Sequence, residues 1–147
     1  MLRIGKLADY GLLIADCLAR ERAQLTTNAI VDETGLPEAT VRKLLKLLVD
    51  AGLVSSRRGV HGGYRLARTA DRITVAELIA AIEGPISLTE CAQDDSTCTL
   101  TASCGQRGNW HVINDLIHQQ LATITLADMT GDLRRGGSRI PVLSVAS

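Results

Sequence analysis

The sequence has few aromatic residues: no phenylalanine, two tyrosines and one tryptophan in 147 residues. A protein that binds RNA or single-stranded DNA by stacking bases on aromatic rings is therefore not expected. No apolar run approaches the roughly 18 to 20 residues that cross a bilayer, and the first residues lack the apolar core of a signal peptide. These absences predict a cytoplasmic protein that has no membrane partner and builds its core from aliphatic side chains.

The net charge of zero hides two segments of opposite charge. Residues 42 to 72 carry eight Lys and Arg against two acidic residues, for a charge of +6. Residues 73 to 132 carry eight acidic residues against one Arg, for a charge of −7. A basic segment alone is more often a solvated surface than a nucleic-acid site, but this one coincides with a motif.

A helix-turn-helix is predicted within the first part of this region. Thr26 or Thr27 can cap a helix that ends at Gly35, and a second helical apolar stripe begins after Pro37 and stops at Gly52. Because that stripe faces the core, the polar residues of the second helix point outward, as those of a recognition helix do toward a major groove. A helical hairpin used only for packing fits the same pattern. The candidate DNA-contacting residues here are Thr27, Glu38, Thr40, Arg42, Lys43 and Lys46.

A β-hairpin is predicted next, with strands at 53–56 and 64–67 that alternate polar and apolar residues. The Gly-rich tip between them carries basic side chains, so it suits a wing that reaches phosphates or the minor groove. The candidate DNA-contacting residues of the wing are Arg57, Arg58, His61, Gly62 and Gly63. We therefore expect a mainly α fold with a small β-hairpin, and a winged helix-turn-helix domain at residues 1–85.

A long amphipathic helix is predicted from about Arg107, after a capping-box helix that opens at Thr74 and ends at Gly84. Its apolar stripe consists of Trp110, Ile113, Ile117, Leu121 and Ile124, with Leu116 beside it. Such a stripe on a small protein predicts an isologous homodimer, although the helix can instead fold back on its own domain. Residues 107–133 are thus assigned to a dimerisation helix and C-terminal segment, and residues 134–147 to a mobile tail.

Three cysteines occupy a polar loop at residues 86–106, and their spacing is informative. Six residues separate Cys91 from Cys98, and five separate Cys98 from Cys104. Structural zinc prefers pairs two to four residues apart, whereas the thiolates of an iron–sulfur cluster lie farther apart. The loop is therefore predicted to bind a cluster, with a zinc-stabilised or redox-active thiol protein as the alternative. Cys17 lies among aliphatic residues and is expected to be a small buried hydrophobic side chain.

These residues together resemble the Rrf2 family of winged-helix regulators, of the IscR and NsrR types. The likeness covers roughly residues 1–130 and rests on the opening residues 1–4 and 9–10, the segments 52–59 and 61–64, and the three loop cysteines. It is greatest for regulators of SUF iron–sulfur assembly operons. The resemblance implies a homodimeric repressor of double-stranded operator DNA that holds an iron–sulfur cluster through Cys91, Cys98 and Cys104. Cluster-assembly scaffold proteins are further candidate partners, and a repressor that senses nitric oxide or redox state is the alternative within the family.

The fourth cluster ligand is where the sequence departs from part of the family. The IscR type has a histidine three residues after the third cysteine, and Arg107 stands there in this chain. Arginine does not ligate iron, and His111 is one possible substitute. In the NsrR type an acidic residue near the N-terminus of the other subunit completes the site, and Asp9 matches that position. The resemblance therefore favours Asp9 in trans and a [4Fe–4S] over a [2Fe–2S] cluster, with a plain surface carboxylate as the alternative for Asp9.

Overall fold

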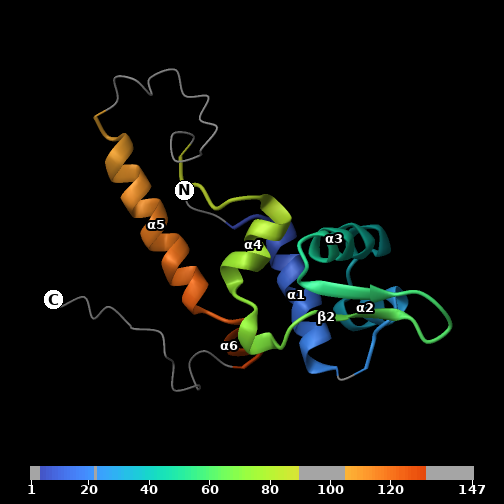
Figure 1. Ribbon diagram of the computed structural model, residues 1–147. Coiled ribbons are helices and arrows are strands. Elements are labelled where there is room, and N and C mark those ends of the chain that lie inside the picture. The colour runs from blue at the N-terminus through green and yellow to red at the C-terminus, as the bar shows by residue number, and fades with distance from the viewer. Residues whose placement is uncertain (1–3, 22, 90–104, 132–147) are drawn as a thin grey trace.

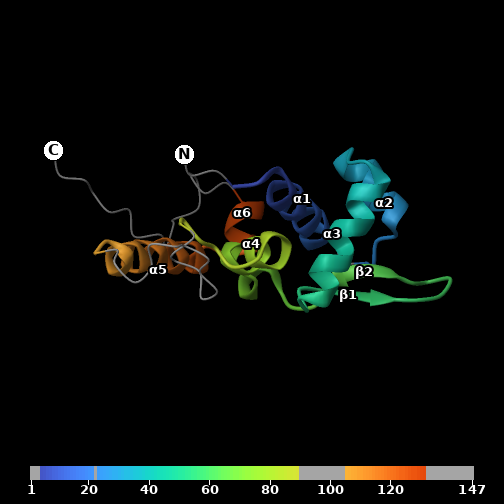
Figure 2. The ribbon, with the colours of Figure 1, turned by 90° about the horizontal axis from the view of Figure 1, so that it is seen from above.

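The computed structural model describes residues 4–21, 23–89 and 105–131, which form helices and one two-stranded antiparallel sheet (Figure 1). Within these residues α5 lies at one end of an elongated molecule, and α2 and the hairpin tip lie at the other (Figure 2). This arrangement confirms the predicted mainly α fold with a small hairpin. The elements are α1 (Lys6–Arg20), α2 (Thr27–Thr34), α3 (Glu38–Asp50), β1 (Val54–Arg57), β2 (Gly63–Leu66), the 3-10 helix η1 (Ala70–Arg72), α4 (Val75–Glu83), α5 (Arg107–Thr123) and α6 (Leu126–Thr130).

The core is aliphatic and lies where α1, α2, α3, α4 and α6 meet. The apolar residues of α3 recur at helical spacing, and all four that face the core are fully buried: Val41, Leu44, Leu45 and Leu48. The other large side chains of the described residues with at most 2% of their surface exposed in this cluster include Ile14, Ile30, Ile73, Leu78 and Leu126. Each buried Leu or Ile contributes about 1.5 to 3 kcal/mol, so this cluster fixes the orientation of α3 without any aromatic side chain.

The two strands are shifted by one residue from their predicted bounds. The register pairs Val54 with Leu66 and Arg57 with Gly63. Leu53 was assigned to the first strand, but its N–H donates to the carbonyl of Leu48 at 2.9 Å and so completes the end of α3. The hairpin therefore begins one residue later and takes Arg57 into the strand.

Helix α6 was not predicted, and it returns the chain to the core after α5. Thr125 and Asp128 form a capping box, in which the Asp128 N–H donates to Thr125 Oγ1 at 3.1 Å. The N–H of Leu126 donates to the carbonyl of Ile73 at 2.7 Å, and the Leu126 side chain is fully buried. The capping box was overlooked because only one buried leucine follows it, which gives no apolar periodicity.

Helix α5 begins at Arg107 as predicted, but Ile124 lies beyond its end in extended backbone. The helix packs mainly on α4, and Asn114 Oδ1 accepts a bond from the N–H of Leu88 at 3.2 Å. Ile117 and Leu121 are half-buried, while no residue of α5 is fully buried. Across residues 4–21, 23–89 and 105–131, no helix has both the length and the apolar character needed to span a bilayer.

Candidate functional site

The turn between α2 and α3 sets the position of the second helix. Thr26 caps α2 by accepting the Ala29 N–H at 3.2 Å, and Gly35 ends the helix with a left-handed φ of 68°. Only glycine adopts that conformation without strain. Leu36 is then buried, and α3 begins directly after Pro37. These contacts confirm the helix-turn-helix predicted from the sequence.

The predicted recognition residues lie on the outer side of α3, except Thr27, which begins α2. Glu38, Arg42, Lys43 and Lys46 are exposed, and Thr40 and Thr27 are half-buried. Arg42 Nη2 lies 2.6 Å from Glu38 Oε1, and Lys46 Nζ lies 3.1 Å from Asp50 Oδ2. Exposed pairs of this kind contribute about 0.3 to 0.5 kcal/mol each, so a phosphate or a base edge can displace them. Within the described part of the chain, Lys43 has no acidic partner.

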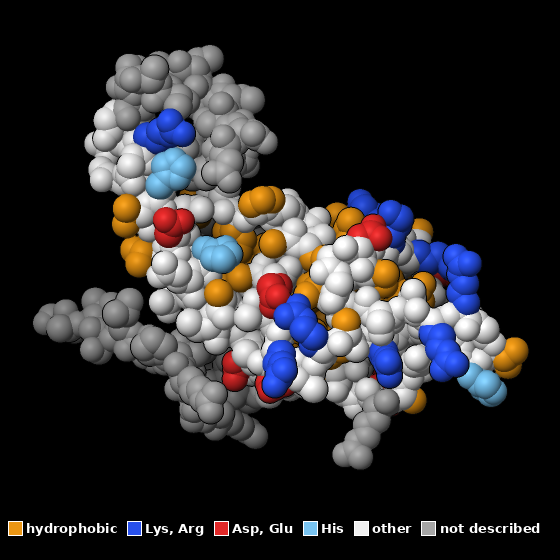
Figure 3. Space-filling model, viewed as in Figure 1, with side chains coloured by type: hydrophobic (Ala, Val, Ile, Leu, Met, Phe, Trp, Pro, Cys, Tyr) orange, Lys and Arg blue, Asp and Glu red, His pale blue; other side chains and the backbone are white. Residues whose placement is uncertain are grey.

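The wing projects from the end of the molecule opposite α5. Its second strand is attached to the loop before α2, because Tyr64 and Leu25 exchange two backbone hydrogen bonds of 2.8 and 2.9 Å. Arg57, Arg58 and His61 are exposed near the tip. Lys and Arg side chains gather over the half of the molecule that carries α3 and the wing (Figure 3).

The wing glycines have a structural role that was not recognised in the sequence. A Cβ on Gly62 would collide with the carbonyl oxygen of Arg57. Gly63 has a φ of 150°, and a Cβ there would lie 2.6 Å from the carbonyl oxygen of Leu25. The two glycines thus allow the hairpin to close and to dock on the loop before α2. Contact of either one with DNA stays a prediction.

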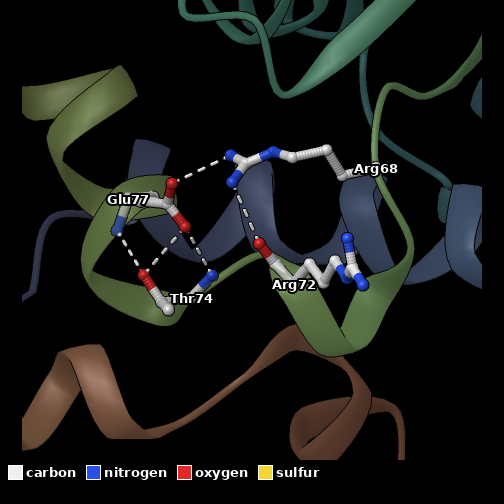
Figure 4. A network of polar contacts seen from close by, with 4 residues as sticks. All are labelled: Arg68, Arg72, Thr74 and Glu77. Atoms are coloured by element: carbon white, nitrogen blue, oxygen red, sulfur yellow. Dashed lines mark hydrogen bonds and ion pairs between the residues drawn. The ribbon is translucent and has the colours of Figure 1, made fainter.

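A polar network joins the wing to α4 (Figure 4). Thr74 and Glu77 form the predicted capping box, with the Thr74 N–H donating to Glu77 Oε2 at 2.8 Å. The other carboxylate oxygen of Glu77 accepts from Arg68 Nη2 at 2.8 Å, while Arg68 Nη1 donates to the Arg72 carbonyl at 3.0 Å. The bonds from Thr74, followed by those from Arg68, lower the pKa of Glu77 below its ordinary value. The part played by Arg68 was missed because nothing in the spacing of its neighbours indicates a bond nine residues away.

The structure describes only some of the predicted cluster ligands. Cys91, Cys98 and Cys104 lie outside the described residues, and no group of three metal-binding side chains occurs within residues 4–21, 23–89 and 105–131. Asp9 is exposed on α1, and its carboxylate has no hydrogen-bond partner among the described residues. His111 is half-buried on α5.

Asp9 also lines a cavity of about 570 Å³ between α1, α4 and α6. The other lining side chains include Leu12, Leu78 and Met129. Lys6 also lines this cavity. A carboxylate in such a position, with no hydrogen bond from the residues that the structure describes, is available to an external ligand. Three thiolates and this carboxylate would together make a donor set that suits an iron–sulfur cluster.

Cys17 is buried in α1, as predicted, with 9% of its surface exposed. Burial raises the pKa of its thiol, and the nearby Glu33 raises it further. A buried, protonated thiol is a poor nucleophile and a poor metal ligand. Cys17 is therefore separate from the predicted cluster site.

The exposed surface of α5 carries four large apolar side chains among polar ones. Trp110, Val112, Ile113 and Leu116 expose between 39% and 60% of their surface. Hydrophobic side chains are visible along this end of the molecule in Figure 3. The predicted stripe is thus divided: Ile117 and Leu121 face α4, while the remaining apolar residues of α5 face solvent.

Comparison with known proteins identifies relatives over most of the chain. The family model Rrf2, described as an iron-dependent transcriptional regulator, matches residues 4–132. The chain is 33% identical over 130 residues to the transcriptional regulator CymR of Bacillus subtilis, which covers 87% of this chain and 89% of CymR.

Solved structures agree with this assignment. The structure of CymR, the global cysteine regulator of B. subtilis, superposes with a TM-score of 0.68 at 32% identity and covers 88% of this chain and 97% of that one. The structure of IscR from T. potens superposes with a TM-score of 0.64 at 30% identity and covers 87% of this chain and 85% of that one. Regulators of this family bind DNA and are typically dimeric. This chain belongs to the Rrf2 family of DNA-binding transcriptional regulators and is not an enzyme.

Proposed function

We propose that this protein is an iron–sulfur cluster-dependent repressor of iron–sulfur cluster assembly genes, of the SUF type. The observation that carries the proposal is a winged helix with exposed basic residues in a chain whose family model is described as iron-dependent. The similarity to IscR of T. potens supports the same assignment. Cluster-assembly scaffold proteins are candidate partners that would deliver the cluster.

The proposed cluster ligands are Cys91, Cys98 and Cys104 of one subunit and Asp9 of the other, for a [4Fe–4S] cluster. When bound, the cluster would supply a redox-labile link between the subunits. The carboxylate of Asp9 supports this assignment, because it accepts no hydrogen bond from the described residues, and such a bond would compete with the metal. His111 is the alternative fourth ligand, and it suits a [2Fe–2S] cluster.

The proposed homodimer is supported by the exposed apolar face of α5. A helix that packs on its own domain along one side and exposes Trp110, Ile113 and Leu116 on the other leaves apolar area in contact with water. A second copy of the same helix would cover it, since an isologous interface uses the same patch on both subunits. The dimer would then place two recognition helices on adjacent half-sites, roughly 34 to 36 Å apart.

The cluster can act on DNA affinity through the packing of α1. Asp9 lies in α1, whose buried face packs against α3 and α4 in the same core. A bond from the partner's cluster to Asp9 would restrain the two winged helices relative to each other. An allosteric coupling of about 1 to 3 kcal/mol changes DNA affinity by roughly five- to 150-fold.

The test of the cluster is spectroscopic and analytical. Protein purified without oxygen should absorb broadly in the visible and contain iron and acid-labile sulfide. Cys98→Ala should lose both, whereas Cys17→Ala, the matched control, should retain them because a buried thiol is a poor metal ligand. A colourless wild-type protein that contains zinc would support a zinc-stabilised thiol module instead. Iron content that Cys98→Ala leaves unchanged would contradict the ligand assignment.

A second candidate function is a regulator of cysteine-related genes, because CymR matches this chain over most of its length. That function needs no cluster for DNA binding. Cluster-free protein that binds its operator with full affinity would favour it. A repressor that senses nitric oxide is distinguished from both by the loss of cluster absorbance and of DNA binding on exposure to nitric oxide.

A further inference from the structure

Four arginines of the wing and of η1 have no acidic partner among the described residues. Four other cations among the described residues are held in ion pairs: Arg20, Arg42, Lys46 and Arg68. The unpaired arginines run from the hairpin tip to its base and on into η1, and all are exposed: Arg57, Arg58, Arg65 and Arg72. A series of like charges is unfavourable by itself and indicates a polyanionic partner.

The hairpin register places two of these arginines on one face. Arg57 pairs with Gly63 and Ser55 pairs with Arg65, so Ser55, Arg57 and Arg65 share the face opposite the buried Val54. Arg57 and Arg65 are diagonal neighbours across the two strands, at a spacing of roughly 7 to 8 Å. Successive phosphates of a DNA strand follow the helix with a comparable step. Arg65 Nε donates to Ser55 Oγ at 3.4 Å, which leaves its terminal nitrogens free.

The position of Arg72 is set by the polar network at the base of the wing. Arg68 bonds the Arg72 carbonyl and the Glu77 carboxylate, and so attaches η1 to the first turn of α4 (Figure 4). The Arg72 guanidinium donates no hydrogen bond within this network. Arg65 and Arg72 both line a shallow groove of about 850 Å³ between this segment and the end of α1. Arg68 is thus a positioning residue, and Arg72 is the cation that it presents.

We propose that Arg65 and Arg72 form a second phosphate-binding surface, which contacts the DNA backbone outside the half-site read by α3 and the wing tip. This inference rests on the proposed operator binding and extends it to flanking DNA. The groove also contains two acidic residues, Glu21 and Asp71, so the proposed contacts come from the two exposed arginine side chains and not from the groove as a whole. Continuity with Arg57 on the wing favours duplex DNA, since one backbone can follow the whole series.

The experiment compares two duplexes that carry one site selected from a random library. The short duplex ends at the outer edges of the half-sites, and the long one has about ten more base pairs, one helical turn, on each side. Each phosphate contact adds about 0.9 to the slope of log affinity against log salt. Each variant removes one contact from each subunit of the proposed homodimer. Between about 50 and 200 mM salt, Arg65→Ala or Arg72→Ala should therefore lose roughly 12-fold less affinity for the long duplex than the wild type loses.

Both variants should bind the short duplex as the wild type does, which also shows that they are folded. Arg20→Ala is the matched control, because it removes an exposed arginine that belongs to a different depression on α1. Equal effects on the two duplexes, or an equal effect of Arg20→Ala, would overturn the inference. If the wild type binds the short duplex and gains nothing from the extension, this inference alone fails. If the wild type selects no site from the library and binds neither duplex, the proposed function fails, and the inference fails with it.

Discussion

The return of the chain through α6 gives a prediction that is independent of the cluster. Leu126 is fully buried in the winged-helix core, and its N–H is bonded to the Ile73 carbonyl. Leu126→Ala removes the only fully buried side chain of α6 and leaves a cavity. Buried Leu→Ala substitutions cost about 2.7 to 5.0 kcal/mol. A helix of five residues can partly collapse into the gap, so we expect a loss of about 3 kcal/mol.

The assay is reversible urea and thermal unfolding of cluster-free protein at one fixed concentration, followed by far-ultraviolet circular dichroism. For a chain of this size, ~3 kcal/mol corresponds to a fall in Tm of roughly 6 to 12 °C. Val60→Ala is the control, because Val60 is 98% exposed on the wing tip and should change stability by less than about 0.5 kcal/mol. A loss below about 1 kcal/mol for Leu126→Ala would refute the docking of α6 and, with it, the anchoring of the end of α5 to the core.

Three other predictions concern charge, readout and association. Glu77→Gln should cost no more than about 1 kcal/mol at pH 7, because the side chain is 39% exposed. Folding lowers the pKa of Glu77 from the ordinary 4.5, so the stability lost in Glu77→Gln should be complete above pH 4.5 and should disappear as the pH falls below that value. Urea titrations that give the same loss of stability at pH 3 would contradict the assignment. Arg57→Ala should weaken all duplexes alike and reduce the salt slope, whereas Arg42→Ala should relax preference at particular bases, by about 1 to 3 kcal/mol; uniform losses for both would show that this division of roles is wrong. Leu116→Asp should shift the protein from dimer to monomer in sedimentation, and an unchanged mass would exclude α5 from the interface.

The winged helix was predictable because its signals are local. Gly35 requires a left-handed backbone, the α3 leucines recur at helical spacing, and Thr74 with Glu77 forms a capping box within four residues. Each of these features can be read from neighbouring residues. The first strand begins one residue later than predicted because the N–H of Leu53 donates to a carbonyl at the end of α3.

The features that were not predicted depend on contacts distant in sequence. Leu126 packs with residues that precede it by more than 40 positions, and its short helix has no periodic pattern. The bond from Arg68 to Glu77 depends on side-chain positions that composition does not specify. The ion pairs of Arg20, Arg42 and Lys46 join residues four positions apart on one helix, so their spacing was present in the sequence but was not used.

The central claim is that the cluster decides how tightly the protein holds its operator. The direct measurement is the affinity for one selected duplex, at one fixed salt concentration, of cluster-loaded and cluster-free protein prepared without oxygen. The account predicts a difference of roughly five- to 150-fold. It also predicts that the difference is abolished by Asp9→Ala and kept by Asp32→Ala, a change at an exposed carboxylate on α2. Equal affinities of the two wild-type forms would contradict control by the cluster.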